Sequence, residues 1–551
     1  MRKIIRPLFL LVTVLFCQNL LAQITFPRNG VYDEREGFYA FTNATIFKSY
    51  NEKVENATMI IKDGRVQIVG TRIAIPKGAV VIDLKGKYIY PSFIDLYSTY
   101  GVPEAKRKEG GGNHFGRQQQ MVSKKEGAYS WNQALQPEYR AHEHFIVDKK
   151  AGEAYRKAGF GTVMTHRADG IHRGTATLVT LGYDREHHII LKEKTAQMLS
   201  FKKGTSTQSY PGSLMGGIAL LRQTYLDGKW YKNGGKEKGI NLSLEAWNDI
   251  QSLPTVFDVR EKLEALRAAK LGKEFGKKYI LKGNGDEYQR LNEIKATGCS
   301  MIIPLKFPDA FDVTDPYDAM MVSLAEMKHW ELAPTNLARL SKAGIEIALT
   351  ADGLEKKSDF LKNIKKAIEN GWSKEAALKA MTFTPAKMMG MSNQVGSLKS
   401  GYLANFIITS GDIFGEKNTI YHNWVRGEPF VLKKLDTPNL EGVYDLRVGK
   451  KKFNLIVNED NKMKIEVNDS TKIEVNSKIS NGLITLSFSP TKKETKLFRL
   501  SGTVGKKEWA GNATLTDGTW TAWTAKYKNA PEKKEDKKKG EKGKFPKDKK
   551  D

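Results

Sequence analysis

Short apolar runs alternate with amphipathic stretches through the middle of the chain. The runs AGFGTVMTH (158–166), KKYILKG (277–283), CSMIIPLKF (299–307) and GIEIALTAD (344–352) are rich in β-forming residues, whereas DVREKLEALRAAKLGKEFG and SDFLKNIKKAIENG repeat with the period of a helix. Alternating strands and helices predict a parallel sheet, and eight such units in about 300 residues fit an α/β fold, the (β/α)8 TIM-like barrel. Five or six strands stand out, so an open α/β sheet remains the alternative.

Hairpin patterns flank this region on both sides. MIIKDGRVQIV turns at Asp63-Gly64, VVIDLKGKYIY turns at Gly86, and NTIYHNWVRGEPFVL turns at Arg426-Gly427. Strands before and after the barrel predict one small sheet domain built from both flanks. Farther along, the stretch from GVYDLRVGKKKFNLIV to TWTAWTAKY contains short alternating strands typical of a small all-β domain, either an antiparallel meander or a small barrel.

These patterns divide the chain into six segments. We expect a signal peptide at 1–22, the first part of the flanking sheet domain at 23–90, the barrel at 91–393, the second part of the sheet domain at 394–436, an antiparallel β domain at 437–528 and a disordered Lys-rich tail at 529–551.

The first segment has the features of a cleaved secretory signal. It begins with basic residues, continues as an apolar run too short to span a bilayer comfortably, and ends at the small residue Ala22. We therefore expect a periplasmic or secreted protein that is not transmembrane. After cleavage Cys299 is the one remaining cysteine, which excludes an internal disulfide.

The formal net charge of +27 raises the question of an anionic partner. No recognisable nucleic-acid-binding motif accompanies the charge, and a secretory signal argues against that partner. We therefore expect no nucleic acid among the partners and interpret the charge as a Lys-rich, solvated surface.

Three stretches resemble the amidohydrolase superfamily. They are GKYIYPSFIDLYSTYG, IALTADG and the long closing segment GWSKEAALKAMTFTPAKMMGMSNQVGSLKSGYLANFIITSGDIF. The resemblance implies a metal-dependent (β/α)8 barrel inserted in a composite β-sandwich. It also implies a hydrolase that acts on carbon–nitrogen bonds of small amide-like substrates, with Zn or another divalent metal as its cofactor if it is active.

A narrower resemblance concerns GAYSWNQALQPEYRA and HWELAPTNLARL. These stretches look like large secreted amidohydrolase-like proteins of Bacteroidetes-type bacteria, in which a degenerate first barrel often precedes a better-equipped second one. The chain is similar to the first half, which implies a second amidohydrolase barrel as a possible partner.

The residues at the family's metal seats depart from its pattern. Tyr97 and Thr99 stand where the resemblance implies His-x-His, and Lys282 stands where it implies a later histidine. A phenol stays protonated near neutral pH, a Thr hydroxyl is a weak neutral donor, and an ammonium repels a cation. The resemblance makes Asp352 the catalytic candidate, as metal ligand and general base, with a turn cap or a pairing with a nearby lysine as the alternative.

Two histidines are candidates for binding a ligand or substrate. His166 and His172 lie in VMTHRADGIHRG, and His166 follows a strand-like run, so we expect it at the barrel mouth where the loops of such barrels gather function. Loop His-Arg pairs also bind carboxylates or cap turns, which is the alternative for both.

Three functions therefore stay open. The chain is an amidohydrolase-fold protein with a degenerate metal site, and so a pseudoenzyme that serves as a scaffold, a ligand-binding module or the partner half of an active barrel. Alternatively it is an unusual hydrolase that uses Asp352 with ligands such as His166. A third possibility is an envelope protein that binds carbohydrate or peptide through its C-terminal β domain.

Overall fold

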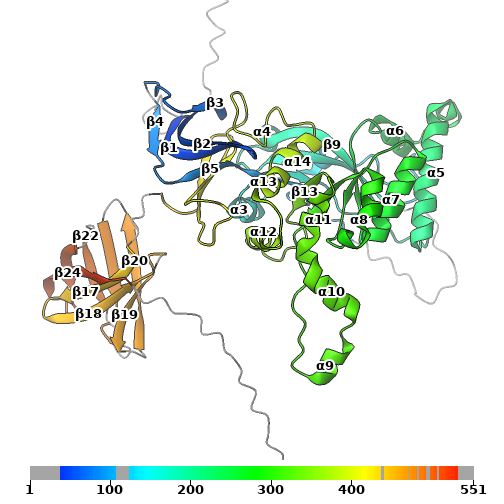
Figure 1. Cartoon of the computed structure of the whole chain (residues 1–551). Coiled ribbons are helices and arrows are strands. Elements are labelled where there is room, and N and C mark those ends of the chain that lie inside the picture. The colour runs from blue at the N-terminus through cyan, green and yellow to red at the C-terminus, as the bar shows by residue number, and fades with distance from the viewer. Residues whose placement is uncertain are drawn as a thin grey trace, which may run out of the picture. The chain divides into compact units, whose positions relative to one another are not determined.

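The computed structural model describes residues 37–77, 79–106, 123, 125–435, 440–458, 460–468, 471–480, 483–491, 497–504 and 508–530 (Figure 1). The chain divides into two compact units, Met1–Lys433 and Lys434–Asp551, which we describe separately. The predicted signal segment, and the predicted tail beyond residue 530, lie outside the described residues. Mixed α/β structure in the first unit and all-β structure in the second agree with the coarse prediction of fold class.

Strands from both flanks of the barrel pair in one sheet of the first unit. Its members are β1 (Phe38–Ser49), β2 (Glu52–Lys62), β3 (Arg65–Gly70), β4 (Val80–Asp83), β5 (Tyr88–Pro91), β14 (Phe406–Thr409), β15 (Ile420–Val425) and β16 (Glu428–Val431). The order is β16-β15-β14-β5-β1-β2-β3, with β4 beside β1, so the antiparallel pair β5–β14 joins the two flanks. Aromatic side chains of both flanks fill its core: the Phe41 ring lies 5.1 Å from Phe406 and 5.0 Å from Trp424.

Two hairpin turns of this sheet pack against each other. A Cβ atom on Gly64 would lie 2.6 Å from the carbonyl oxygen of Arg426, and one on Gly427 would lie 2.8 Å from the Cα of Gly64. Both glycines also have positive φ angles, 73° and 78°. The turns identified in the sequence therefore need glycine for their close approach as well as for their backbone conformation.

A second eight-stranded sheet forms the barrel. Its strands are β6 (Phe93–Ser98), β7 (Phe160–Thr165), β8 (His172–Thr180), β9 (Ile190–Ser200), β10 (Thr255–Asp258), β11 (Ile280–Lys282), β12 (Ser300–Pro304) and β13 (Ile347–Thr350), adjacent in chain order. The first and last strands lie side by side, because Thr350 Oγ1 donates to the Tyr97 carbonyl and the Ala351 amide donates to Asp95 Oδ2, each at 2.9 Å. The sheet is therefore nearly closed.

One strand corrects the prediction of a regular (β/α)8 barrel. Strand β8 is antiparallel to both β7 and β9, whereas the other neighbouring pairs are parallel. The reason is the length of the connections. The six residues between β7 and β8 leave no room for the crossover helix that a parallel strand requires, and the connection to β9 holds only the short helix α4 (Glu186–Ile189).

Helices occupy the other connections of the barrel unit. They are α2 (Ala141–His144), α3 (Lys149–Lys157), α5 (Leu214–Lys232), α6 (Leu242–Asp249), α7 (Lys262–Glu274), α8 (Leu291–Thr297), α9 (Pro316–Met321), α10 (Leu324–Leu332), α11 (Asn336–Lys342), α12 (Asp359–Glu369), α13 (Lys374–Met381) and α14 (Phe383–Met388). The stretch that begins DVREKLEAL differs from the prediction, because Asp258 ends β10 and the helix begins at Lys262. Among the described residues, no helix combines the length and apolar character needed to cross a membrane.

The second unit is a closed antiparallel barrel. It comprises β17 (Gly442–Val448), β18 (Lys451–Val457), β19 (Met463–Asn468), β20 (Thr471–Ser480), β21 (Leu483–Phe488), β22 (Phe498–Val504), β23 (Glu508–Thr514) and β24 (Trp520–Asn529). Alternate side chains such as Leu446, Leu455, Phe498, Trp509 and Trp523 fill its interior. Pairing of β17 with β24 closes the barrel and removes its edges.

Asn423 ties the composite sheet to the barrel. Its side chain is completely buried and accepts a hydrogen bond from Ser92 Oγ at 2.9 Å. Its amide nitrogen donates to the carbonyl oxygens of Arg156 at 3.0 Å and Phe160 at 2.8 Å. One side chain on β15 thus satisfies two backbone acceptors at the end of α3 and the start of β7.

We predict that Asn423→Ala lowers the free energy of unfolding of the first unit by about 2–4 kcal/mol, because two buried carbonyl groups lose their donor. Urea unfolding followed by the far-ultraviolet helix signal checks this, since the described helices all belong to that unit. Asn233→Ala on the exposed end of α5 is the control, with an expected change below about 0.5 kcal/mol. Equal small effects for both variants would contradict the role of Asn423.

Candidate functional site

Charged and aromatic side chains from five parallel strands meet at the barrel mouth. Strands β6, β7, β10, β11 and β13 bring their C-terminal ends to one face, the face that carries active sites in such barrels. Strand β8 runs the opposite way, so its N-terminal end reaches the same face. We call the following six residues the mouth cluster: Tyr97, His166, Arg173, Asp258, Lys282 and Asp352.

Two ion pairs sharing one carboxylate form the centre of the mouth cluster. Arg173 Nη2 lies 3.0 Å from Asp258 Oδ2, and Lys282 Nζ lies 3.5 Å from Asp258 Oδ1. Lys282 Nζ also lies 2.9 Å from Asp352 Oδ2. Two cations therefore face two carboxylates, and the cluster is electrically balanced within the protein.

The ionised form of each central group is stabilised by its neighbours. Burial opposes the charge on Asp258, but Arg173 and Lys282 outweigh it and lower the pKa of this carboxyl group. Burial likewise works against Lys282, yet Asp258 and Asp352 raise the pKa of its ammonium above the ordinary lysine value. The pKa of Arg173 is also raised, since Tyr97 and Asp258 offset its burial. The cations are consequently fixed charges at neutral pH.

Tyr97 takes part in the cluster as a neutral phenol. Arg173 Nη1 donates a hydrogen bond to its hydroxyl oxygen at 2.8 Å, and Lys282 Nζ lies 4.7 Å from the ring centroid. Burial raises the pKa of the phenol above its ordinary value. Thr99 lies beyond the end of β6 and is exposed. The structure thus brings Tyr97 together with Lys282 and Asp352, and it leaves Thr99 outside the cluster.

His166 lies inside the cluster without a hydrogen-bond partner. Its ring is fully buried and 4.5 Å from the Tyr97 ring, and neither ring nitrogen has an acceptor or donor. Burial, with the charge of Arg173, lowers its pKa to about 3. His166 is therefore a neutral imidazole with two unsatisfied nitrogens beside fixed charges.

His172 is placed apart from the cluster. Its Nδ1 accepts the Gly174 amide at 3.1 Å, its Nε2 lies 3.4 Å from Gln197 Oε1, and its ring lies 5.1 Å from that of Trp247 on α6. Burial lowers its pKa to about 3 as well. Because successive side chains of a strand point to opposite faces, Arg173 reaches the mouth while His172 packs on the outer helices.

Asp95 fixes the backbone at two positions of the mouth through hydrogen bonds. It is fully buried, with Oδ1 accepting the Tyr97 amide and Oδ2 the Ala351 amide, each at 2.9 Å. Burial raises its pKa to about 6. Asp95 therefore connects the first barrel strand to the residue before Asp352, which fixes both sides of the mouth.

The residues of the mouth cluster do not fit a divalent metal. In the described part of the chain, no group of three or more His, Cys, Asp or Glu side chains is arranged to hold one. The Lys282 ammonium contacts the two carboxylates that would otherwise be ligands, and it would repel a cation there. Asp352 is the accessible member, with 40% of its side chain exposed against 11% for Lys282.

Sequence reasoning missed Arg173 and Asp258. Asp258 follows the apolar run TVF, and a strand ending in aspartate was the signal that could have identified it. Arg173 offered no comparable signal, because its position at the mouth depends on the reversed direction of β8.

We predict that Arg173→Leu destabilises the first unit by about 3–5 kcal/mol, because Asp258 stays buried after losing its closest cation. Urea unfolding at neutral pH measures the change. The control is Arg222→Leu, because Arg222 and its partner Glu274 are both exposed. We expect this variant to lose less than about 1 kcal/mol of the free energy of unfolding. An equal loss in the free energy of unfolding for the two variants would contradict a stabilising role of the mouth cluster.

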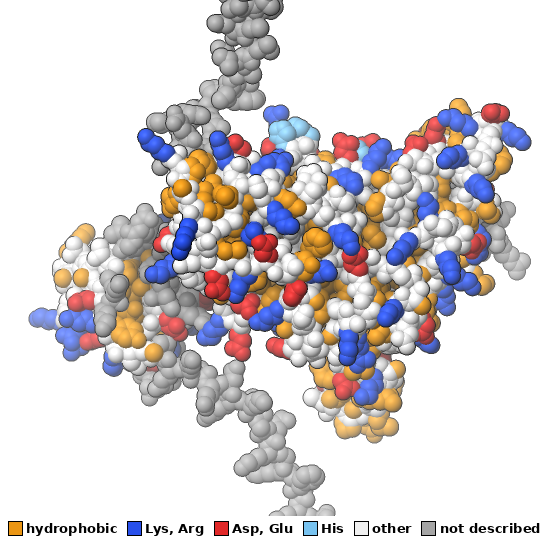
Figure 2. All heavy atoms as spheres, turned by 45° about the horizontal axis from the view of Figure 1, so that its top comes forward, with side chains coloured by type: hydrophobic (Ala, Val, Ile, Leu, Met, Phe, Trp, Pro, Cys, Tyr) orange, Lys and Arg blue, Asp and Glu red, His pale blue; other side chains and the backbone are white. Residues whose placement is uncertain are grey.

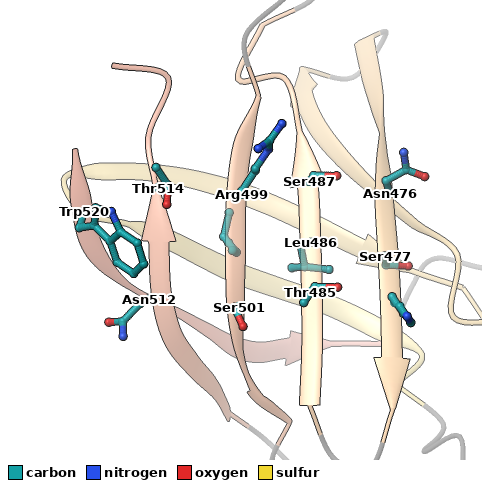
Figure 3. Close-up of a pocket in the computed structure, with 12 residues that line it drawn as sticks. Asn476, Ser477, Thr485, Leu486, Ser487, Arg499, Ser501, Asn512, Thr514 and Trp520 are labelled. Atoms are coloured by element: carbon teal, nitrogen blue, oxygen red, sulfur yellow. The ribbon is translucent and has the colours of Figure 1, made fainter. Parts of the chain in front are cut away.

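A separate polar hollow of about 750 Å³ lies on the outer face of the second unit (Figure 3). Strand register aligns Asn476, Ser487, Arg499, Thr514 and Trp520 in one row across five strands. Thr485, Ser501 and Asn512 form the neighbouring row. Trp520 is 74% exposed at one end, which is unusual for so large an apolar side chain.

Comparisons with known proteins agree on the first unit. Residues 264–432 match the model of the amidohydrolase family. A solved amidohydrolase from Thermotoga maritima superposes with a TM-score of 0.56 at 21% identity, covering 71% of this chain and all of that one. An adenine deaminase from Lactobacillus delbrueckii is 38% identical over 55 residues, about one tenth of each chain. Residues 264–432 thus resemble the amidohydrolase family, and the chain shares its fold with a solved amidohydrolase.

Proposed function

We propose that the barrel of this chain has lost metal-dependent hydrolysis and serves as a non-catalytic module of the cell envelope. It would bind a small amide-like ligand or act as the scaffold that partners an active amidohydrolase barrel. The observation that carries the proposal is Lys282, whose ammonium pairs with Asp258 and Asp352 at the place where a metal would need those carboxylates free.

The geometry also favours a particular ligand chemistry. The exposed part of the mouth cluster is the Asp352 carboxylate, which accepts hydrogen bonds, while the cations behind it are already paired. An amide N–H or an ammonium group is the complement of such a carboxylate. The neutral imidazole of His166, with its two unsatisfied nitrogens, lies deeper in the mouth than Asp352 and beside the Tyr97 ring.

The competing function is a hydrolase that uses Asp352 as general base without the usual ligands. His166 is the neighbouring imidazole that such chemistry would recruit. Against this function stands the ion pair of Asp352, because the Lys282 ammonium lies 2.9 Å from its Oδ2 and occupies the carboxylate that would have to accept a proton from water.

We predict that the full-length protein, purified without chelators, contains no stoichiometric zinc or manganese and does not hydrolyse dipeptides, hydantoins or lactams. Elemental analysis and a hydrolysis panel test this. One tightly held ion per chain that disappears in Asp352→Ala, but persists in the exposed-site control Asp249→Ala, would overturn the proposal. Hydrolysis without bound metal that is lost in His166→Met would favour the competing function instead.

The polar hollow of the second unit favours carbohydrate binding as a second candidate function. Short hydroxyl and amide side chains in two rows can hydrogen-bond sugar hydroxyls, and an exposed indole can stack on the apolar face of a sugar ring. Among the described residues no acidic side chain lines the hollow, and Arg499 and Lys478 lie in it, so acidic sugars would be accepted.

We predict that acidic oligosaccharides change the tryptophan fluorescence of the full chain and that Trp520→Ala weakens their binding by about tenfold or more, which corresponds to about 1.4 kcal/mol. Titration calorimetry measures the affinity. Tyr527→Ala on the same strand replaces an exposed aromatic residue outside the hollow, and should leave binding unchanged. Equal affinity of the Trp520→Ala and Tyr527→Ala variants for the oligosaccharides would contradict carbohydrate binding in the hollow.

A further inference from the structure

A projecting arm follows the barrel strand β12 (Figure 1). It comprises residues 308–332, including α9 and α10, and returns to the barrel through Ala333 and Pro334, which are buried. At its base the His329 Nδ1 lies 3.1 Å from the Tyr288 hydroxyl, with the two rings stacked. The rest of the arm extends away from the unit.

The helices of this arm bury no side chain within the chain. Neither α9 nor α10 contains a buried residue, although they are only 6 and 9 residues long. Their ends are well capped: Asp315 accepts the Tyr317 amide at 2.8 Å, and Ser323 and Glu326 form a capping box. Caps alone stabilise helices of this length poorly, since such helices depend on packing of an apolar face.

Apolar side chains cover the arm. The exposed fraction is 80% for Tyr317, 81% for Met320, 83% for Met321 and 68% for Leu324. Phe311, Val313, Met327 and Trp330 are also exposed. Figure 2 shows hydrophobic side chains gathered over this projecting part. Methionine and aromatic residues are enriched in interfaces between proteins, and exposed apolar side chains gathered in one place mark an interaction site.

The charge of the arm indicates what covers it. Residues 308–332 contain six acidic residues (Asp309, Asp312, Asp315, Asp318, Glu326 and Glu331) against Lys328 as the single lysine or arginine, whereas the whole chain carries +27. An acidic arm is repelled by an anionic membrane surface, which removes lipid as the occupant. A strongly basic protein attracts it, and the basic protein at hand is a second copy of this chain.

We propose that the arm is a self-association element whose apolar face packs against the basic surface of a second copy of the chain. Each copy contributes one arm and receives one, which makes a closed, two-fold symmetric dimer. Apolar burial supplies the affinity and the charge difference speeds and orients association. The arm leaves β12 beside the strand that carries Lys282, so the partner copy approaches the mouth side of the barrel.

Sedimentation velocity and light scattering of the full-length protein test this. We expect a dimer at micromolar concentration and at least about tenfold weaker self-association for Met320→Ser with Met321→Ser, since two exposed methionines on each copy lose their burial. Asp309→Lys with Asp318→Lys should weaken it as well, and more so at low salt than at high salt.

The matched control is Met215→Ser on α5, a methionine that is 79% exposed outside the arm and should leave the dimer intact. Unchanged far-ultraviolet spectra establish that the arm variants remain folded. A monomeric native protein over the accessible concentration range overturns the proposal, as does a dimer that persists in both arm variants. Binding of the native protein to anionic vesicles, lost in Met320→Ser with Met321→Ser, overturns it in favour of a membrane.

Discussion

A buried carboxylate must be paired, and the barrel mouth is organised around that constraint. Asp258 ends a strand in the interior of the mouth, where an isolated charge would be too costly. Two cations on two different strands satisfy it, Arg173 from β8 and Lys282 from β11. Lys282 also forms an ion pair with Asp352. A metal ion would do the same electrostatic work for a pair of carboxylates, and here the protein supplies the positive charge from its own side chains.

The use of side-chain cations in place of a metal ion makes the charge balance of the mouth depend on the direction of one strand. Arg173 reaches Asp258 because β8 runs against its neighbours and presents its first residues at the mouth. In a fully parallel barrel that end of the strand would lie at the opposite face. The reversed direction of β8 and the ion pairs of the mouth are therefore parts of one arrangement.

The sequence predicts some residues of the fold and of the mouth cluster and not others. Local motifs identified the superfamily, the strand that carries Tyr97 and the strand end that carries Asp352, because these depend on neighbouring positions in the chain. The sequence offered a pairing of Asp352 with a nearby lysine as one alternative, but the motifs did not identify Lys282 as that lysine, because the two residues lie on different strands far apart in the chain. The direction of β8 was not predictable from its apolar pattern, since a buried strand reads alike in either direction. The role of Asp258 was missed because its stretch was interpreted as helix from the first residue. The exposed apolar arm was not predicted, because the sequence alone does not show whether the apolar side chains of a segment are buried in a core.

The contact between Gly64 and Arg426 has a consequence for the synthesis of this protein. Strands β1 to β5 leave the ribosome before the barrel, but the partner that β5 needs on one edge is β14, more than 300 residues later. Until then β5 presents an unpaired edge, and the aromatic face that receives Phe406 and Trp424 is uncovered. In a nascent chain this unpaired edge and uncovered apolar face favour non-native contacts for as long as the whole barrel takes to emerge. The strands translated before the barrel thus complete their sheet only after it.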